Sequence, residues 1–339
     1  MITNNSRKSA LILRLPGLSL ALGVATVATI IGKMVPIIGA PVICIVIGVA
    51  IAAWRKPSEK FRPGIVTASK LILQISVVVL GSQLSLMQIV KVGFTSLPVM
   101  LGSLGVCLLG AFWIGRWLGI VGDLRTLIGV GTGICGASAI AAVTPIIGAA
   151  SVDVAYAIST IFLFNLTAVL TFPYLGHLLG LSQHSFGLFA GTAINDMSSV
   201  VAASTTYGST AANYAIVVKL TRTMLIIPIS LVLASVARRK LNVNQEKSKV
   251  RINRLVPWYL IGFLVVATVN SIGLIPQSAH HNLVQISIFL IAIALSAIGL
   301  STDISALRRT GHRPLLLGGI LWVLVSLTSL FLQFITRSL

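Results

Sequence analysis

Eleven long, almost uncharged apolar runs constrain this chain more than any other feature of its sequence. An α-helix needs about 20 such residues to cross the hydrocarbon core of a bilayer. The runs cover residues 16–35, 38–54, 66–86, 96–115, 126–150, 152–173, 186–205, 211–236, 257–275, 283–300 and 315–336. They are long and do not alternate, which excludes the strands of a membrane barrel. The pattern predicts an all-α integral membrane protein with about 9–11 transmembrane segments.

The composition supports a membrane environment and argues against nucleic acid as a partner. Hydrophobic residues make up 56% of the chain and charged residues only 9%, whereas soluble domains carry about 25% charged residues. The formal net charge is +19, but the basic residues lie in short runs between apolar segments. This distribution is typical of the positive-inside rule rather than of a basic binding face. We therefore expect the lipid bilayer to be the partner of most of the surface.

Loop charges predict the direction of the segments. Basic residues gather in residues 7–14, 55–62, 237–256 and 301–314, which we expect to be cytoplasmic, while 174–185 and 276–282 contain histidines as their only basic residues and are expected outside. The N-terminus is then cytoplasmic. The apolar run after the basic head is too long for a cleavable signal peptide, so we interpret it as the first membrane helix.

Two segments do not fit this alternation. The loops at 116–125 and 237–256 are basic and expected inside, whereas the loop at 174–185 is expected outside, so an odd number of crossings must separate it from each of them. Two apolar segments lie between 116–125 and 174–185, and two more between 174–185 and 237–256. The simplest solution makes 126–150 re-entrant from inside and 186–205 re-entrant from outside. If both instead span as broken helices, the loop at 174–185 moves inside.

We expect one membrane domain overall, with an N-terminal half (1–236) that contains both discontinuous segments. A basic cytoplasmic linker (237–256) would join it to C-terminal membrane helices (257–339). Gly81, Ile89, Lys91 and Gly93 recur as Gly299, Leu307, Arg309 and Gly311 at a constant offset of 218. The charge map makes the two copies antiparallel, and inverted repeats are the usual build of secondary transporters. This predicts an inverted-repeat transporter core.

The first discontinuous segment contains the glycine-rich stretch 131–145, which ends in Pro145. Such backbone unwinds readily, and at membrane depth it is tolerated where it lines a cavity or packs within protein. Freed N–H groups bind anions and freed carbonyls bind cations. Candidate substrate-binding residues here are Thr132, Gly133, Cys135, Gly136 and Ser138. The alternative is a close-packed interface of small residues.

The second discontinuous segment contains Asp196, the only acid in the middle of an apolar run, beside Asn195, Ser198 and Ser199. A carboxylate there costs about 2.5–3.5 kcal/mol on insertion scales, so it implies water, a cation or a proton. We assign Asp196 an ion-coupling role and its three polar neighbours a substrate-binding role. The alternative is a structural aspartate satisfied by main-chain donors.

Lys219 and Arg222 lie deep in the segment 211–236, three residues apart and hence on one helical face. Two cations facing one cavity suit an anionic substrate, and we include both among the substrate-binding candidates. The alternative is a salt bridge to Asp196. Asn165, in the middle of 152–173, is a candidate for a hydrogen bond between helices.

The sequence offers little for catalysis. It contains no Walker-type loop, no Ser/His/Asp set, no paired carboxylates and no zinc-like Cys/His spacing, and its three cysteines each lie in an apolar run. We therefore expect no enzyme activity, no cofactor and no metal centre.

With these motifs in view, the chain resembles the bacterial sulfate-exporter family of YeiH-like membrane proteins over nearly its full length. The resemblance rests on Gly-Ile-Cys-Gly-Ala-Ser (133–138) with Pro145, Gly-Thr-Ala-Ile-Asn-Asp (191–196), Lys-Leu-Thr-Arg (219–222) with Pro228, and the run 299–307. The family pattern has a histidine before the acid where this chain has Asn195. The resemblance implies a multi-pass inner-membrane protein similar in design to cation/proton antiporters and bile-acid transporters.

The leading hypothesis is a secondary transporter of a small anion, sulfate-like or organic, coupled to H⁺ or Na⁺. One alternative is a Na⁺/H⁺-type antiporter without an anion substrate. Another is a membrane scaffold or sensor that binds a partner through 237–256. A homo-oligomer is compatible with each of these.

Overall fold

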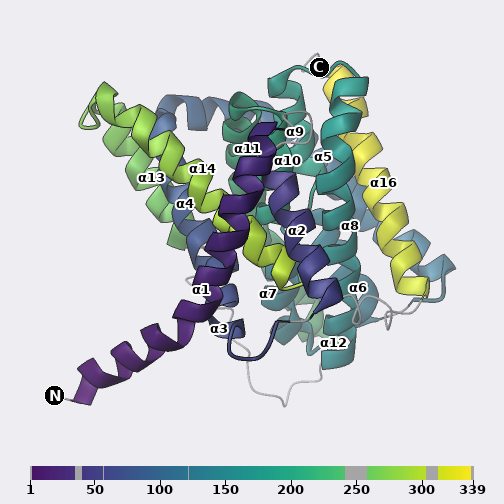
Figure 1. The fold of residues 1–339 in the computed structure, drawn as a ribbon. Coiled ribbons are helices and arrows are strands. Elements are labelled where there is room, and N and C mark those ends of the chain that lie inside the picture. The colour runs from purple at the N-terminus through teal and green to yellow at the C-terminus, as the bar shows by residue number, and fades with distance from the viewer. Residues whose placement is uncertain are drawn as a thin grey trace. The chain divides into compact units, whose positions relative to one another are not determined.

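Figure 1 shows the computed structural model, in which helices account for the regular structure of the described residues. These residues are 2–34, 40–55, 57–120, 122–240, 258–302 and 312–336. Within them, seven helices are long and apolar enough to cross a membrane, and three shorter helices are also apolar. The expected class, an all-α multi-pass membrane protein, is confirmed.

Within the described residues, each predicted apolar run coincides with one helix or two consecutive helices, except 66–86, which is divided among several short helical pieces. The long uninterrupted helices are α1 (Ile2–Met34), α5 (Leu86–Trp117), α8 (Ser151–Leu178), α14 (Gln277–Leu300) and α16 (His312–Ile335). Shorter helices are α2 (Ala40–Trp54), α3 (Arg62–Thr67), α4 (Leu73–Leu80) and α13 (Trp258–Ser271), with a π-helical turn at Ala68–Ile72 and a 3₁₀ turn at Gly81–Gln83. The run 211–236 forms α11 (Ser209–Met224) followed directly by α12 (Ile226–Lys240).

The contacts divide the chain into two compact units, and each unit combines segments that are distant in sequence. Unit 1 comprises Met1–Gln88 and Tyr259–Ile304, and unit 2 comprises Ile89–Trp258 and Ser305–Leu339. The division of the sequence at 237–256 stays a prediction, because residues 241–257 lie outside the described part. The same is true of the repeat at offset 218, since Leu307, Arg309 and Gly311 also lie outside it.

Unit 1 contains two close approaches between glycines. Gly17 of α1 lies against Gly64 of α3, and Gly48 of α2 lies against Gly299 of α14, where an added Cβ on Gly299 would sit 2.9 Å from the Cα of Gly48. Small residues allow helix backbones to approach closely where lipid offers no hydrophobic driving force. These pairs therefore set the spacing of the helices in unit 1.

Both segments that we predicted to be discontinuous are broken, and both belong to unit 2. The first consists of α6 (Asp123–Gly133) and α7 (Ala137–Ile147), and the second of α9 (Gln183–Ala193) and α10 (Met197–Tyr207). The first break falls at Ile134–Gly136, where Gly136 has φ +67°, a conformation that L-residues rarely adopt. Pro145, which we had linked to unwinding, instead lies inside the last turns of α7.

The second broken segment is a re-entrant hairpin, because its end returns to its beginning. The hydroxyl of Tyr207, at the end of α10, donates to the carbonyl of Leu181 just before α9. The ring of Tyr207 also stacks on Phe186 and on His177 of α8. The open end of this hairpin, where α9 begins and α10 ends, therefore lies beside the C-terminal end of α8.

The first broken segment is a re-entrant hairpin from the opposite face of unit 2. Its tip residue Gly136, just before α7, lies against Ile161 in the middle of α8. The other end of α7 lies four residues before α8 begins, so α7 runs antiparallel to the first part of α8. The arm α6 runs antiparallel to the second half of α5, since Gly133 lies against Leu104 and Gly115 against Arg125.

The opposite orientation of the hairpins follows from α5, whose first half packs beside the second hairpin. Val99 and Met100 there share a cluster with Leu188 of α9 and Val218 of α11. Figure 1 shows the result within unit 2: α6, α7 and α12 lie at one end, and α9, α10 and α11 at the other.

The lengths of the arms agree with this arrangement. Each of the four arms has 11 residues, which corresponds to about 16 Å of helix and to about half of a 30 Å hydrocarbon core. Because two collinear arms of this length would also cross the core, it is the return of each segment toward its own beginning that favours the re-entrant solution over two spanning broken helices.

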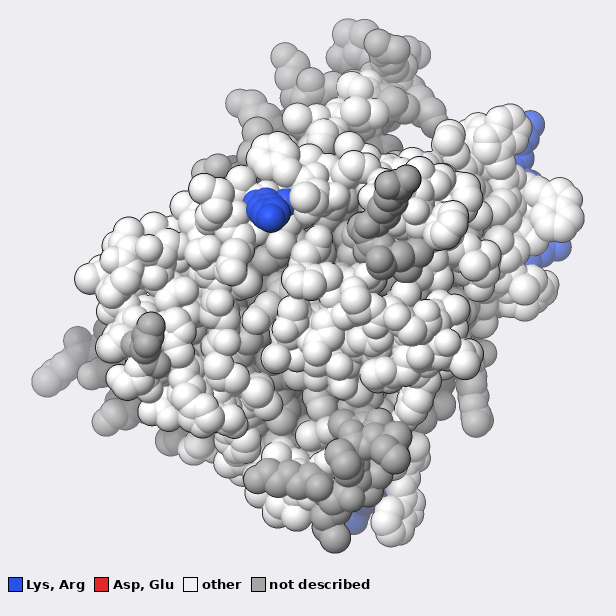
Figure 2. Space-filling view, turned by 90° about the horizontal axis from the view of Figure 1, so that it is seen from above, with Lys and Arg blue, Asp and Glu red and all other residues white. Residues whose placement is uncertain are grey.

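The surface suits a lipid environment. Large apolar side chains such as Trp113 of α5 (66% exposed) and Phe331 of α16 (62% exposed) point outward. Figure 2 shows a face on which uncharged residues dominate among those that are coloured, with a few basic side chains in view.

Candidate functional site

The tips of the two hairpins meet near the middle of unit 2. A Cβ placed on Gly136, at the first tip, would lie 3.4 Å from the Cβ of Asp196 and 3.6 Å from the carbonyl carbon of Asn195, at the second tip. The structure thereby brings the two sequence motifs, 131–138 and 195–199, into direct contact.

Two buried cations from α11 join the hairpins. The ammonium of Lys219 donates to the carbonyl oxygens of Ile134, at 2.9 Å, and of Ile194, at 2.7 Å. The guanidinium of Arg222 donates through Nη1 to the carbonyl of Thr192 and through Nη2 to that of Thr132, the latter at 3.3 Å. Both side chains are fully buried.

These four carbonyls belong to the C-terminal ends of α6 and α9, which lack helical partners because both helices stop there. The C-terminal end of a helix also carries about half a negative charge. Lys219 and Arg222 therefore satisfy the main chain of both breaks and neutralise both negative helix ends at once.

The contacts reveal an internal repeat that the sequence analysis missed. Gly-Thr-Gly-Ile (131–134) and Gly-Thr-Ala-Ile (191–194) are offset by 60 residues. In both copies the threonine carbonyl binds Arg222 and the isoleucine carbonyl binds Lys219. Because the two hairpins enter unit 2 from opposite faces, this repeat is inverted. Comparing the two glycine-rich segments with each other would have found it.

The opposite ends of the breaks, the N-termini of α7 and α10, reach accessible space. Ala137 and Ser138 in the first turn of α7 are exposed, and Asp196, Met197 and Ser198 at the start of α10 are half-buried. Helix N-termini carry unpaired N–H groups and about half a positive charge, which favour an anion. This is the part of the site that a solute could contact.

Asp196 is the N-cap of α10. Its Oδ2 accepts from the Ser199 N–H at 3.4 Å and from the hydroxyl of Ser198. Among the described residues no ion pair joins Asp196 to Lys219, so the salt bridge that we considered is not formed.

Polar contacts from neighbouring helices hold the second hairpin. Asn165 of α8 accepts through Oδ1 from the Asn195 N–H at 3.0 Å, so the hydrogen bond expected of Asn165 is formed, but to the break between α9 and α10 rather than to another helix. The hydroxyls of Thr192 and Ser329 of α16 lie 2.6 Å apart. Ser329 was not among the candidates, because a lone serine in an apolar helix gives no signal in the sequence.

The candidate residues thus gather at one place but differ in accessibility. Thr132, Gly133, Cys135, Gly136, Asn195, Ser199, Lys219 and Arg222 are buried, Asp196 and Ser198 are half-buried, and Ser138 is exposed. The alternative interpretation, close packing of a small residue between helices, also holds for one of them, since Gly133 packs closely against Leu104. In the described part of the chain, no three His, Cys, Asp or Glu side chains cluster as metal ligands would.

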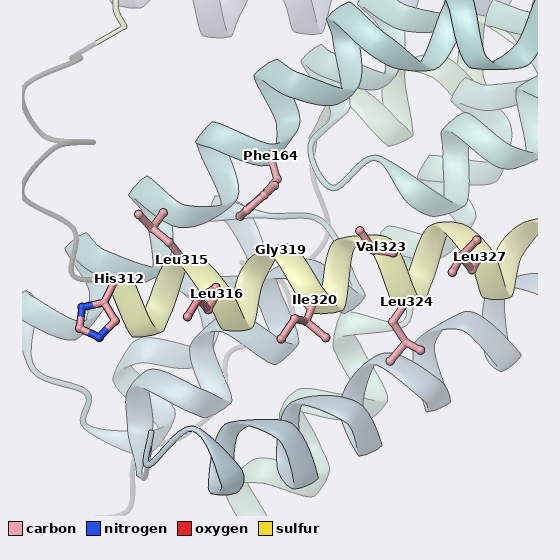
Figure 3. Close-up of a pocket in the computed structure, with 9 residues that line it drawn as sticks. All are labelled: Phe164, His312, Leu315, Leu316, Gly319, Ile320, Val323, Leu324 and Leu327. Atoms are coloured by element: carbon pink, nitrogen blue, oxygen red, sulfur yellow. The ribbon is translucent and has the colours of Figure 1, made fainter.

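A separate groove of about 740 Å³ runs along α16. Figure 3 shows that Leu316, Ile320, Leu324 and Leu327 project from this helix, with Phe164 opposite and His312 at one end. Its lining is almost wholly apolar, which suits lipid chains and not an anion. It is therefore not part of the candidate site.

The helices and the paired hairpins define a multi-pass, all-α membrane protein. The chain belongs to the family described as conserved hypothetical protein 698, whose model matches residues 16–318. A UPF0324 membrane protein of Streptococcus pyogenes serotype M3 is 42% identical over 328 residues, covering 94% of this chain and 96% of the relative. A second, from Streptococcus agalactiae serotype V, is 41% identical over 325 residues, covering 94% and 97%. These names state a membrane protein and no substrate.

Proposed function

We propose that the protein is a secondary transporter that binds a small anion at the tips of the two hairpins. Its movement would be coupled to H⁺ or Na⁺ through Asp196. The observation that carries the proposal is the asymmetry of the breaks: buried cations cap their C-terminal ends, while their N-terminal ends reach accessible space.

The charge balance at the tips favours an anion. The full charges of Lys219 and Arg222 exceed the partial negative charges of the α6 and α9 ends, which amount to about half an elementary charge each. The positive ends of α7 and α10 add to this excess, and among the described residues Asp196 is the one acid at the tips. In the low-dielectric interior such an excess attracts a negative ligand.

The structure refines the roles of the two cations within the proposal. Both are fully buried and bonded to main-chain carbonyls. They would attract the anion through their field, while Thr132, Cys135, Asn195 and Ser199 shape the tips. The groups in direct reach would be the N–H groups of α7 and α10 with the hydroxyls of Ser138 and Ser198.

The anion would be sulfate-like or a small organic acid. Sulfate is the substrate that the resemblance to YeiH-like proteins implies, and two opposed helix N-termini with hydroxyl donors suit its oxygens. The proposed location is the bacterial plasma (inner) membrane with the N-terminus in the cytoplasm, which the basic loops support.

The test is flux in proteoliposomes that contain the purified protein. We expect uptake of radiolabelled sulfate, or of a competing organic acid, that responds to an imposed proton or sodium gradient. Asp196→Asn should remove the response to the gradient, and Asp153→Asn, at the start of α8, serves as the matched control. Gradient-dependent flux that survives in Asp196→Asn would refute the coupling role.

A Na⁺/H⁺-type antiporter is the second candidate, favoured by one observation. The Oδ1 atoms of Asn195 and Asp196 are buried acceptors that no described donor reaches. Cation exchange in vesicles free of sulfate and organic acids would favour this function over anion transport.

A further inference from the structure

Two consecutive residues in the break between α9 and α10 each present an unsatisfied oxygen. The Oδ1 atoms of Asn195 and Asp196 are shielded from solvent and accept no hydrogen bond from the described residues. The whole side chain of Asn195 is also buried, with 1% exposure. Buried acceptors are almost always paired, because leaving them unpaired is unfavourable. Two at one break require a positively charged or donating partner.

Both residues are held in place by contacts that do not involve these oxygens. Asp196 is fixed through Oδ2 by Ser198 and Ser199, and Asn195 is fixed through its main-chain N–H by Asn165. The donors to Oδ2 and the positive end of α10 stabilise the ionised carboxylate. An ionised carboxylate and an amide oxygen can only accept, so neither can satisfy the other.

We propose that Asn195 Oδ1 and Asp196 Oδ1 bind a Na⁺ ion, and that this ion is the coupling ion of the transporter. The inference rests on the proposed function, which left H⁺ and Na⁺ open. Oxygen atoms alone suit a hard cation. The single carboxylate, with Lys219 and Arg222 close by, suits one positive charge rather than two.

A proton is the competing occupant. It could join the two oxygens only by neutralising the carboxylate that caps α10, whereas Na⁺ leaves that negative charge at the positive end of the helix. Binding of Na⁺ would thus stiffen the tip of the second hairpin at the place where the anion binds, which gives the ion a physical route to the substrate.

The repeat of 131–134 at 191–194 indicates that this site belongs to the second hairpin alone. It also suggests a substitution that the break between two helices should accommodate. In the first hairpin, Cys135 and Gly136 occupy the positions equivalent to Asn195 and Asp196, and neither side chain offers an oxygen. Asn195→Cys therefore places at the second break a side chain that the first break already accommodates. Asn195→Asp keeps an oxygen at the same position.

The experiment measures binding of radioactive sodium to the purified protein in detergent, with choline chloride holding the ionic strength constant. We expect saturable binding by the wild type. Asn195→Cys and Asp196→Asn should weaken it by at least about tenfold, whereas Asn195→Asp should retain it. Asn270→Ala, which removes an amide bonded to Leu84 in unit 1, should bind as the wild type does.

Absence of saturable binding by the wild type would overturn the inference, as would unchanged binding by a folded Asn195→Cys variant. Anion flux driven by protons in sodium-free vesicles would also overturn it while leaving the transporter in place. Sodium binding without any anion flux would support the site and remove the anion-transport proposal.

Discussion

At the scale of single residues, Lys219 and Arg222 show how a membrane protein can keep two broken helices buried. Each break leaves main-chain carbonyls without partners, and no water is present in the bilayer core to satisfy them. One lysine and one arginine supply donors to all four carbonyls. Each of the two side chains reaches both hairpins, the lysine through its single ammonium and the arginine through the two terminal nitrogens of its fork.

Lys219→Met tests this structural role, because methionine fills a similar volume without donating. The carbonyls of Ile134 and Ile194 would lose their donor, at a cost of about 1–3 kcal/mol for each unsatisfied group. We expect a clear fall in the melting temperature of the detergent-solubilised protein, followed by tryptophan fluorescence. Lys91→Met, at an exposed position of α5, should melt as the wild type does. Equal melting temperatures for both variants would contradict the role of Lys219 as a donor to both hairpins.

The sequence predicts more at the scale of elements than at that of residues. Hydropathy locates the apolar helices of the described residues, because burial in lipid demands long apolar runs. Loop charge singles out 126–150 and 186–205 as irregular, and both are broken. The hydrogen bonds of Lys219 to Ile134 and Ile194 could not be predicted from the sequence. Every residue has a main-chain carbonyl, so the residue type does not mark the acceptor, and the two partners lie 85 and 25 residues away. The substrate-binding role assigned to Lys219 and Arg222 stays a prediction.

Close packing of α2 against α14 gives a prediction for unit 1. A methyl group on Gly299 would come within 2.9 Å of the Cα of Gly48, so Gly299→Ala must push the two helices apart. Overpacking of this kind costs about 1–3 kcal/mol. Gly23→Ala in α1 is the matched control, because its added Cβ would meet nothing within 4 Å. Thermal unfolding should show a lower melting temperature for Gly299→Ala alone, and a shared response would argue against the glycine contact as the cause.

At the scale of the whole molecule, the fold explains how the number of apolar segments agrees with the distribution of charge among the loops. The positive-inside rule demands an odd number of crossings between the basic and the histidine-containing loops, and two hairpins that enter unit 2 from opposite faces provide it. The hairpins also place the ends of their flanking helices together in pairs. Trp117 and Ala150 flank the first hairpin, and Leu179 and Ser209 flank the second.

This pairing predicts which positions share a side of the membrane. Single cysteines at Trp117 and Ala150 should react with an impermeant maleimide from the same side, and cysteines at Leu179 and Ser209 from the opposite side; all four positions are exposed. The native cysteines Cys44, Cys107 and Cys135 are buried, so their background should be low. Labelling of intact cells and of inverted vesicles would assign the sides, with Trp117 and Ala150 expected on the cytoplasmic one. If the broken segments instead spanned the bilayer, the two members of each pair would label from opposite sides, because each segment would then carry the chain across.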